Sequence, residues 1–195
     1  MRQLIAGMKI SVDGKTEGPE GFADWVDAWS EDYGLTPQID ACLLGGRMYP
    51  GYEQYWTAIQ DRPDQPLPMT GRLATPEELQ WARFAQRTPH FVLSNSLSSA
   101  AWPATRFVRR LQDVAALKQE PGKDIYLMGG ARIVSSLTDA GLVDELRLIV
   151  CPLIAGAGRP LFEAMTRRQN LSLQSVSPLQ GGRACLVYAV DHPPG

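Results

Sequence analysis

Apolar residues along this 195-residue chain fall into short runs separated by longer stretches of mixed polarity. Apolar runs of about four to eight residues, bounded by Gly, Pro or Asn, are typical of buried β-strands. Two stretches that flank the pair Gly181-Gly182 predict an antiparallel hairpin near the C-terminus. The predicted strands cover residues 3–10, 39–44, 90–93, 125–128 and 146–151, and the predicted hairpin covers 171–179 and 183–190.

The stretches between the predicted strands carry apolar residues at helical spacing or begin with a capping residue. Thr75, for example, precedes Pro76 and two glutamates, which is the pattern of a helix start. Phe22 and Val26 fall on one face of another predicted helix. The predicted helices cover residues 22–33, 75–87, 106–119 with Thr105 as the cap, and the segment from Gly130 to Gly141.

Strands that alternate with helices are typical of a mainly parallel sheet with helices on its faces. The terminal hairpin adds an antiparallel edge to that sheet. A chain of 195 residues suits one domain, since two domains would each be small. We therefore predict a single α/β domain that covers residues 1–195.

The charge of the chain argues against partners that bind by general electrostatic attraction. The net charge is −2 and the basic residues are scattered, so we expect no binding to nucleic acid. The adjacent pairs Arg109-Arg110 and Arg167-Arg168 are expected to be solvated charges on helix surfaces. The sequence contains no apolar run of about 18 residues and no signal peptide, so we expect a cytoplasmic protein without a membrane segment.

The cysteines and histidines do not form the pattern of a metal site. Cys42, Cys151 and Cys185 lie singly in apolar runs, so they are expected to pack as small hydrophobic residues. The histidines are His90 and His192, and the sequence has neither His-x-Glu nor Pro-Cys-x-x-Cys. These absences exclude a zinc deaminase, and we predict no metal site.

The most informative segments are glycine-rich or polar and follow predicted strands. The run IYLMGGARI, residues 125–133, ends a strand in two glycines and begins a helix at once. Free N–H groups at such a helix start favour an anion such as a pyrophosphate, and Arg132 adds a positive charge. Gly45-Gly46-Arg47 repeats this pattern, and Ser94-Asn95-Ser96 offers hydrogen-bonding side chains after a third strand. Because ligands bind outside the carboxyl ends of parallel strands, we expect these segments to meet at one site.

The order of five segments along the chain resembles one enzyme family. SVDG, LLGGRMY, FVLSNS, YLMGGARI and PLIAGAGRPLF follow one another at fitting spacings. Together they are similar to the dihydrofolate reductase-like family, and most of all to the branch that contains the reductase domain of riboflavin biosynthesis. The resemblance covers nearly the whole chain and implies a dihydrofolate reductase-like fold. It also implies an NADPH-dependent reductase that acts on a small heterocyclic substrate, pterin-like or pyrimidine-like, and forms a homodimer.

The resemblance also implies which residues bind the cofactor. The first strand and the Ser-x-Asp-Gly segment border the nicotinamide in this family, and the loops after the next strands meet the cofactor phosphates. The double-glycine turn meets the pyrophosphate. The implied cofactor-binding residues are Ala6, Gly14, Gly45, Gly46, Arg47, Met48, Ser94, Asn95, Gly129, Gly130, Ala131, Arg132 and Ile133.

Two features of the chain depart from the family pattern. The phosphate loop of the family usually reads Gly-Arg-x-Thr, whereas here the arginine of Gly45-Gly46-Arg47-Met48 is displaced by one position and the threonine is missing. NADPH is therefore expected over NADH mainly because Arg47 can still reach a 2′-phosphate. The second feature is the substrate acid, which dihydrofolate reductases carry on their first helix. Asp27 and Glu31 share one face of the predicted helix and are the candidate catalytic acids, with no basis in sequence for choosing between them.

A protein of another functional class remains an alternative to the reductase. The altered phosphate loop is compatible with a non-catalytic protein that binds a nucleotide or another small molecule and retains the reductase fold. Residues 14–36 contain Lys15 as their sole basic residue, which argues against a sugar-phosphate substrate such as the riboflavin intermediate. Oxidation of NADPH in the presence of a pterin or quinoid acceptor would distinguish an enzyme from a binding protein.

Overall fold

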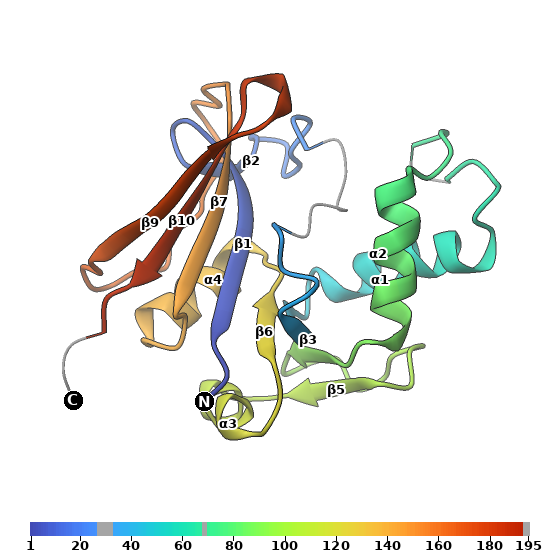
Figure 1. The fold of residues 1–195 in the computed structure, drawn as a ribbon, viewed down its shortest axis with the longest axis horizontal. Helices are drawn as coiled ribbons and strands as arrows, with labels where there is room; N and C mark the ends of the chain where they lie inside the picture. The colour runs from blue at the N-terminus through green and yellow to red at the C-terminus, as the bar shows by residue number, and fades with distance from the viewer. Residues whose placement is uncertain (27–32, 68–69, 193–195) are drawn as a thin grey trace.

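A computed structural model describes residues 1–26, 33–67 and 70–192, whose strands form one large sheet and one small sheet (Figure 1). The large sheet has eight strands in the order β5-β4-β3-β6-β1-β7-β10-β9, and the small sheet pairs β2 with β8. Neighbouring strands from β5 to β7 are parallel, whereas β10 is antiparallel to both β7 and β9. The strands are β1 (Leu4–Ser11), β2 (Lys15–Glu17), β3 (Ile39–Gly45), β4 (His90–Leu93), β5 (Thr105–Val108), β6 (Asp124–Leu127), β7 (Glu145–Cys151), β8 (Arg159–Pro160), β9 (Leu171–Pro178) and β10 (Ala184–Val190).

Helices cover both faces of the parallel part of this sheet. The α-helices in the described residues are α1 (Tyr49–Asp61), α2 (Pro76–Arg87), α3 (Leu111–Gln119) and α4 (Ala131–Asp139). None of them is long and apolar enough to span a bilayer. The predicted α/β architecture, with a mainly parallel central sheet and an antiparallel terminal hairpin, is confirmed.

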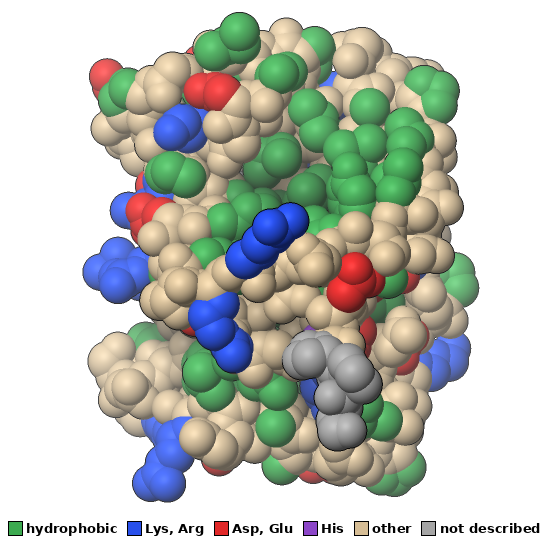
Figure 2. All heavy atoms as spheres, turned by 90° about the vertical axis from the view of Figure 1, so that its left-hand side faces the viewer, with side chains coloured by type: hydrophobic (Ala, Val, Ile, Leu, Met, Phe, Trp, Pro, Cys, Tyr) green, Lys and Arg blue, Asp and Glu red, His purple; other side chains and the backbone are tan. Residues whose placement is uncertain are grey.

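The terminal hairpin ends the sheet in an exposed edge strand. Gly181 and Gly182 both have positive φ angles in the turn, as glycines allow. All eight residues of β9 are exposed, and Leu171, Leu173 and Val176 are among the exposed large hydrophobic side chains. Figure 2 views the molecule from the β9 side and shows hydrophobic side chains grouped on that face.

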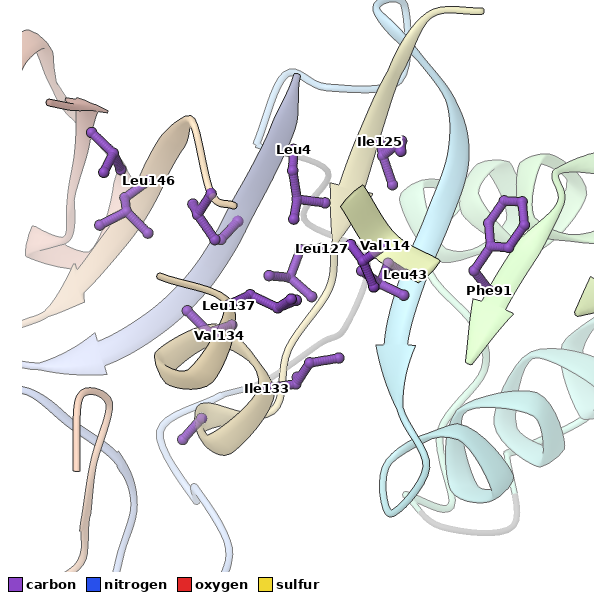
Figure 3. Packing of buried hydrophobic residues seen from close by; sticks show 14 of the residues in the cluster. Leu4, Leu43, Phe91, Val114, Ile125, Leu127, Ile133, Val134, Leu137 and Leu146 are labelled. Atoms are coloured by element: carbon purple, nitrogen blue, oxygen red, sulfur yellow. The ribbon is translucent and has the colours of Figure 1, made fainter. Parts of the chain in front are cut away.

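Alternate residues of the central strands point into two separate cores, one on each face of the sheet. Leu4 and Leu127 belong to the core beneath α3 and α4, and Figure 3 shows Leu137 of α4 facing these strands. Ile5 and Tyr126, their neighbours in sequence, belong to the aromatic core beneath α1 and α2. Cover on both faces explains why these strands read as almost continuous apolar runs.

Helix α2 begins as the sequence predicts. The Thr75 hydroxyl accepts a hydrogen bond from the Glu78 N–H at 3.2 Å, and the Glu78 carboxylate accepts one from the Thr75 N–H at 2.8 Å. This reciprocal capping box, with Pro76 in the first turn, satisfies backbone donors that a helix start leaves free.

The prediction that Thr105 caps a helix over residues 106–119 is wrong in its first part. Residues 105–108 form β5, which pairs in parallel with β4, and the helix begins only at Leu111. Phe107 packs against the core beneath α1 and α2, whereas Val108 lies in the opposite core. Phe107 and Val108 therefore alternate between the two faces of the sheet, as in a strand, and do not form the first turn of a helix.

Two further differences concern the segments around the predicted first helix. Residues 22–26 form bends and turns instead of a helix, and Phe22 is 61% exposed, so its expected apolar face is not buried. Residues 27–32 lie outside the described residues. Helix α1 has no counterpart among the predicted elements, although its buried residues recur at helical spacing. They are Tyr49, Tyr52, Tyr55, Trp56 and Ile59.

Candidate functional site

A cavity of about 890 Å³ opens where the loops after β3, β4 and β6 meet the starts of α3 and α4. β4, β3 and β6 are neighbours in the sheet and run in parallel, so their carboxyl ends lie at one edge. The cavity is lined by Gly45, Gly46, Arg47, Met48, Leu93, Ser94, Asn95, Ser96, Leu97, Arg109, Arg110, Leu111, Gly130, Ala131, Arg132, Ile133, Ser136 and Arg159.

The glycine pair after β3 lets three loops approach one another closely. The Gly46 N–H donates to the Leu93 carbonyl at 3.0 Å, and the Gly45 N–H donates to the Gly129 carbonyl at 3.3 Å. A Cβ atom on Gly46 would lie 2.5 Å from Ser94 Oγ, which is too close for any side chain. These contacts fix the walls of the cavity relative to the sheet.

The start of α4 presents backbone donors to the cavity. Gly130 is the N-cap residue, and no side chain caps this nine-residue helix. The first N–H groups of an α-helix have no partner within the helix, and the helix dipole places partial positive charge there. Gly129, with φ of +104°, precedes this helix, and the peptide bond between Gly129 and Gly130 is cis. This arrangement suits a bound anion.

The side chains around the cavity are positively charged. Five arginines line it, and no Asp or Glu is among its lining residues. Within the described residues, Arg47, Arg110 and Arg132 form no ion pair, whereas Arg159 Nε lies 3.1 Å from Glu17 Oε1. The cavity is therefore suited to a ligand that carries several negative charges.

Two of these arginines correct an expectation from the sequence. Arg109 and Arg110 were expected to be solvated charges on a helix surface, but they line the cavity just before α3. The Arg109 guanidinium donates to the carbonyls of Ser94 and Leu97 and so shapes the loop after β4. The Asp113 carboxylate accepts from the backbone N–H groups of Arg109 and Arg110 at 2.8 and 2.9 Å, which lowers the pKa of Asp113.

Most of the residues implied by the family resemblance line this one cavity, but some do not. Ala6 is fully buried in β1, and Gly14 lies in the turn after β1, where its N–H donates to the Ser11 carbonyl at 2.9 Å. Gly129 is not among the lining residues, and a Cβ atom there would lie 2.8 Å from Met8 Sδ. The candidate acids Asp27 and Glu31 lie outside the described residues.

Sequence reasoning missed several residues that line the cavity. They are Leu93, Leu97, Arg109, Arg110, Leu111, Ser136 and Arg159. A signal for the arginine pair was present, because Asp113 is a typical first-turn acid of a helix that begins at Leu111. Arg159 lies in the segment PLIAGAGRPLF, which is part of the family resemblance, whereas no comparable signal marks Ser136, which reaches the cavity only through the tertiary fold. No group of three His, Cys, Asp or Glu suited to a metal occurs in the described part of the chain.

Comparisons with known proteins show the family of the chain. A family model of the RibD C-terminal domain matches residues 2–185. The uncharacterized protein YyaP of Bacillus subtilis (strain 168) is 32% identical over 192 residues, which cover 96% of this chain and 94% of YyaP.

Solved structures share the fold at low sequence identity. A protein of Shewanella sp. PV-4 named for riboflavin biosynthesis superimposes with a TM-score of 0.67 at 17% identity, covering 97% of this chain and 99% of that one. Dihydrofolate reductase from Enterococcus faecalis, complexed with NADP(H), superimposes with a TM-score of 0.58 at 15% identity and covers 97% of each chain. With the family model and the full-length relative, these likenesses show that the chain belongs to the RibD C-terminal domain family and has a dihydrofolate reductase-like fold.

Proposed function

We propose that this protein is an NADPH-dependent reductase that transfers a hydride to a small heterocyclic substrate, pterin-like or pyrimidine-like. The observation that carries the proposal is the arginine-lined, acid-free cavity at the carboxyl ends of β3, β4 and β6. Membership of a family named for a riboflavin-biosynthesis domain and the likeness to a dihydrofolate reductase bound to NADP(H) support a reductase. The reduced nicotinamide, when bound, supplies the hydride.

The residues of the cavity fit the anionic parts of this cofactor. The uncapped start of α4, with Gly130 leaving its backbone open, would hold the pyrophosphate. Arg132, in the first turn of α4, would add a charge-assisted contact to it. Ser94 and Asn95 would bind the adenosine half through their hydroxyl and amide groups.

Preference for NADPH over NADH rests on the arginines. Met48 lacks the hydroxyl that a threonine would offer a 2′-phosphate. Arg47 and Arg110 are both exposed, both line the cavity and pair with no carboxylate in the described residues. A phosphate monoester carries nearly two negative charges at neutral pH, so two such arginines would compensate for the missing hydroxyl.

A calorimetric titration with NADPH and, separately, NADH tests the cofactor, and a stopped assay with pterin, pyrimidine and quinoid acceptors tests the reaction. We expect NADPH to bind much more tightly than NADH, and at least one acceptor to be reduced. Failure to bind either dinucleotide would overturn the proposal. Tight NADPH binding with no acceptor reduced would favour the second candidate, a non-catalytic nucleotide-binding protein, which the missing hydroxyl at Met48 also favours.

The substrate acid stays a proposal based on the family resemblance alone. Asp27 or Glu31 would hold the heterocycle and deliver a proton to it, in the cytoplasm where we expect the protein to act. Replacing each separately with Asn or Gln should lower kcat without changing the affinity for NADPH. An unchanged kcat in both variants would remove these two residues from the mechanism.

We also propose that the chain forms a homodimer through β9. Leu173 pairs with Tyr188, and Val176 pairs with Leu186, so the apolar sheet face continues from the core to an open edge. β9 carries no charged residue over its whole length. Monomeric proteins usually protect an open sheet edge with charged residues, and β9 lacks them. A partner strand that pairs with β9 would therefore itself be uncharged and apolar. A second copy of β9, antiparallel to the first, is such a strand.

Sedimentation velocity on wild type and on Leu173→Lys tests this interface. We expect a wild-type dimer and a Leu173→Lys monomer, because the lysine would place like charges opposite each other. Leu73→Lys is the matched control, since Leu73 is 57% exposed and Leu173 is 55% exposed. A monomeric wild type, or a Leu173→Lys variant that stays dimeric, would rule out this interface.

A further inference from the structure

One carboxylate joins the turn after β1 to the loop after β7. Asp13 Oδ1 accepts hydrogen bonds from Ser11 Oγ at 2.7 Å and from the Ala155 N–H at 2.9 Å. Asp13 Oδ2 accepts a third from the Gly156 N–H at 2.9 Å. The Ser11 hydroxyl in turn accepts from the Lys15 N–H at 2.9 Å, which closes the turn that carries Asp13. We call this set of hydrogen bonds, made by Ser11 and Asp13 of the SVDG segment, the clasp.

The clasp is permanently charged at physiological pH. The hydrogen bonds from Ser11 and from the backbone of Ala155, and more weakly that from Gly156, lower the pKa of Asp13 to about 2. Desolvation raises this pKa but does not outweigh these bonds, and the Asp13 side chain stays exposed. Asp13 therefore holds the loop in place as a fixed structural element and does not act as a pH switch.

The loop held by Asp13 ends at the cofactor cavity. We call residues 152–161 the strap. β8, near its end, pairs with β2, and the Arg159 carbonyl accepts from the Thr16 hydroxyl at 3.2 Å. A Cβ atom on Gly158 would lie 2.1 Å from the Glu17 carbonyl oxygen, so the strap needs glycine to approach β2 this closely. Arg159 is the strap residue that lines the cavity.

The strap is also attached at its two ends. The Val12 N–H donates to the Leu153 carbonyl at 2.9 Å, and the Leu161 N–H donates to the Gly14 carbonyl at 3.0 Å. Arg159 Nε lies 3.1 Å from Glu17 Oε1 and 3.5 Å from Glu163 Oε1, and the Asp13 carboxylate holds the residues between these attachments.

Ile154 is 77% exposed, so the strap is not anchored there by burial. Gly156 and Gly158 both have positive φ angles and give the free loop wide conformational freedom. A flexible loop that must order itself on binding weakens affinity, and prior ordering of the loop removes that penalty.

We propose that Asp13 is a positioning residue for the cavity: through Ala155 and Gly156 it fixes the strap and so holds Arg159 at the cavity edge, where Arg159 contacts a phosphate of the ligand. The identity of that ligand as NADPH rests on the proposed function, whereas the clasp and the strap do not. Asp13 itself is not among the residues that line the cavity.

A double-mutant cycle measures this coupling. We expect Arg159→Ala to weaken NADPH binding by roughly ten-fold, because it removes one charge-assisted contact. Asp13→Asn should weaken binding less, because Arg159 keeps its pairs with Glu17 and Glu163 while the strap before it loosens. The double variant should bind no more weakly than Arg159→Ala alone, since Asp13 acts only through Arg159. Ser11→Ala, a milder change to the same clasp, should give a smaller loss in the same direction and keeps the test possible if Asp13→Asn does not fold.

The chain offers a matched control for loss of a clasp. The Asp139 carboxylate accepts from the Thr166 N–H at 2.9 Å, the Thr166 hydroxyl at 2.7 Å and the Arg167 N–H at 3.1 Å. This second clasp ties a loop that does not line the cavity. Asp139→Asn should therefore leave NADPH affinity unchanged, while Asp13→Asn lowers it.

Hydrogen exchange of the Ala155 and Gly156 amides reports on the strap without any cofactor. Both amides should exchange faster in Asp13→Asn than in wild type, and their exchange rates should not change in Asp139→Asn. Losses that add up in the double variant, or full affinity despite faster exchange, would overturn the proposal. If wild type binds inorganic pyrophosphate but not NADPH, the proposed function fails, and the same cycle with pyrophosphate as the probe still decides the role of Asp13.

Discussion

Two groups of arginines in this molecule differ in how their charges are balanced. Arg72 lies beside the aromatic core and makes two hydrogen bonds to the Glu78 carboxylate, at 2.7 and 2.9 Å. Glu78 also accepts from the Tyr55 hydroxyl at 2.5 Å and from the Thr75 N–H at 2.8 Å, so every charge there is compensated within the protein. Arg47, Arg110 and Arg132 form no ion pair in the described residues.

The Arg72–Glu78 pair stabilises the fold, whereas the cavity arginines Arg47, Arg110 and Arg132 have no ion-pair partner in the described residues. Burial raises the pKa of Glu78, but the hydrogen bonds from Arg72, Tyr55 and Thr75 outweigh it and hold that pKa at about 2. In the cavity, neighbouring positive charges repel one another and gain nothing for stability until an anion binds. Substitutions in the two groups should therefore have opposite consequences for stability and binding.

The largest expected effect on stability is that of Glu78→Ala. Glu78 is fully buried, and its loss leaves the Tyr55 hydroxyl and the Arg72 guanidinium without their acceptor. We expect a loss of about 3 kcal/mol in the free energy of unfolding, the lower end for buried pairs because Arg72 is 37% exposed. Urea unfolding measures this loss, and NADPH affinity should not change. A destabilisation below that of an ordinary surface substitution would contradict the structural role.

Gly130→Val should have the opposite effect: it should lower the affinity for NADPH and leave the free energy of unfolding unchanged. A Cβ atom on Gly130 meets no atom within 4 Å, and its φ of −71° suits any residue. The new side chain would nevertheless occupy the space at the start of α4 that a pyrophosphate needs. We expect NADPH binding to fall by more than about a hundred-fold, nearly 3 kcal/mol, in a calorimetric titration. Unchanged affinity would remove the pyrophosphate from this position.

The aromatic core should also show a pH dependence that the cavity lacks. His90 is buried, and its Nδ1–H donates to the Thr88 carbonyl at 2.7 Å while Nε2 accepts from the Tyr52 hydroxyl at 3.2 Å. Burial lowers the pKa of His90 from 6.5 to about 4, against the opposing effect of the Thr88 carbonyl.

Between these two pH values the unfolded chain binds a proton that the folded protein does not. The free energy of unfolding that depends on neutral His90 is therefore at its full value above pH 6.5. It falls by about 3 kcal/mol in total as the pH drops towards 4. Thermal unfolding at a series of pH values measures the loss. His90→Gln should flatten this part of the profile, and an equally steep profile in that variant would assign the effect to other groups.

The smallest expected effect distinguishes the arginines of the cavity from one another. Arg47→Ala should weaken NADPH binding by about ten-fold and NADH binding much less, if Arg47 contacts the 2′-phosphate. Stability should stay the same or rise slightly, because one of several like charges is removed. Equal losses for the two dinucleotides would mean that Arg47 does not read the 2′-phosphate, and Arg110 would then be the residue to replace.

Much of the fold could be predicted because strands and helices impose different spacings on apolar residues. The strands over residues 39–44, 90–93 and 125–128 were predicted almost to their ends, because most residues on both faces of each strand are buried and the run is largely apolar. The capping box at Thr75 was predictable because it is built from residues only three positions apart. Such elements can be predicted because the interactions that form them lie within a few residues of one another in the sequence.

The errors fall where the local pattern was ambiguous. Val108 fits a helical spacing with Leu111, but β5 forms because it pairs with β4 and places Phe107 and Val108 on opposite faces. Helix α1 was missed because its start has no side-chain cap and no acidic residue in the first turn, so Pro50 there has no supporting signal. Packing of its aromatic face against the sheet stabilises it.

The sequence by itself determined the α/β class, the family resemblance and three glycine or polar segments at strand ends. These properties follow from residue types and spacings along a few turns or strands. Only the tertiary structure decided that Arg109, Arg110 and Arg159 share a cavity with Arg47 and Arg132, and that Asp13 holds the strap. Contacts between residues more than a hundred positions apart depend on strand order and loop paths, and spacing along the chain carries no record of either.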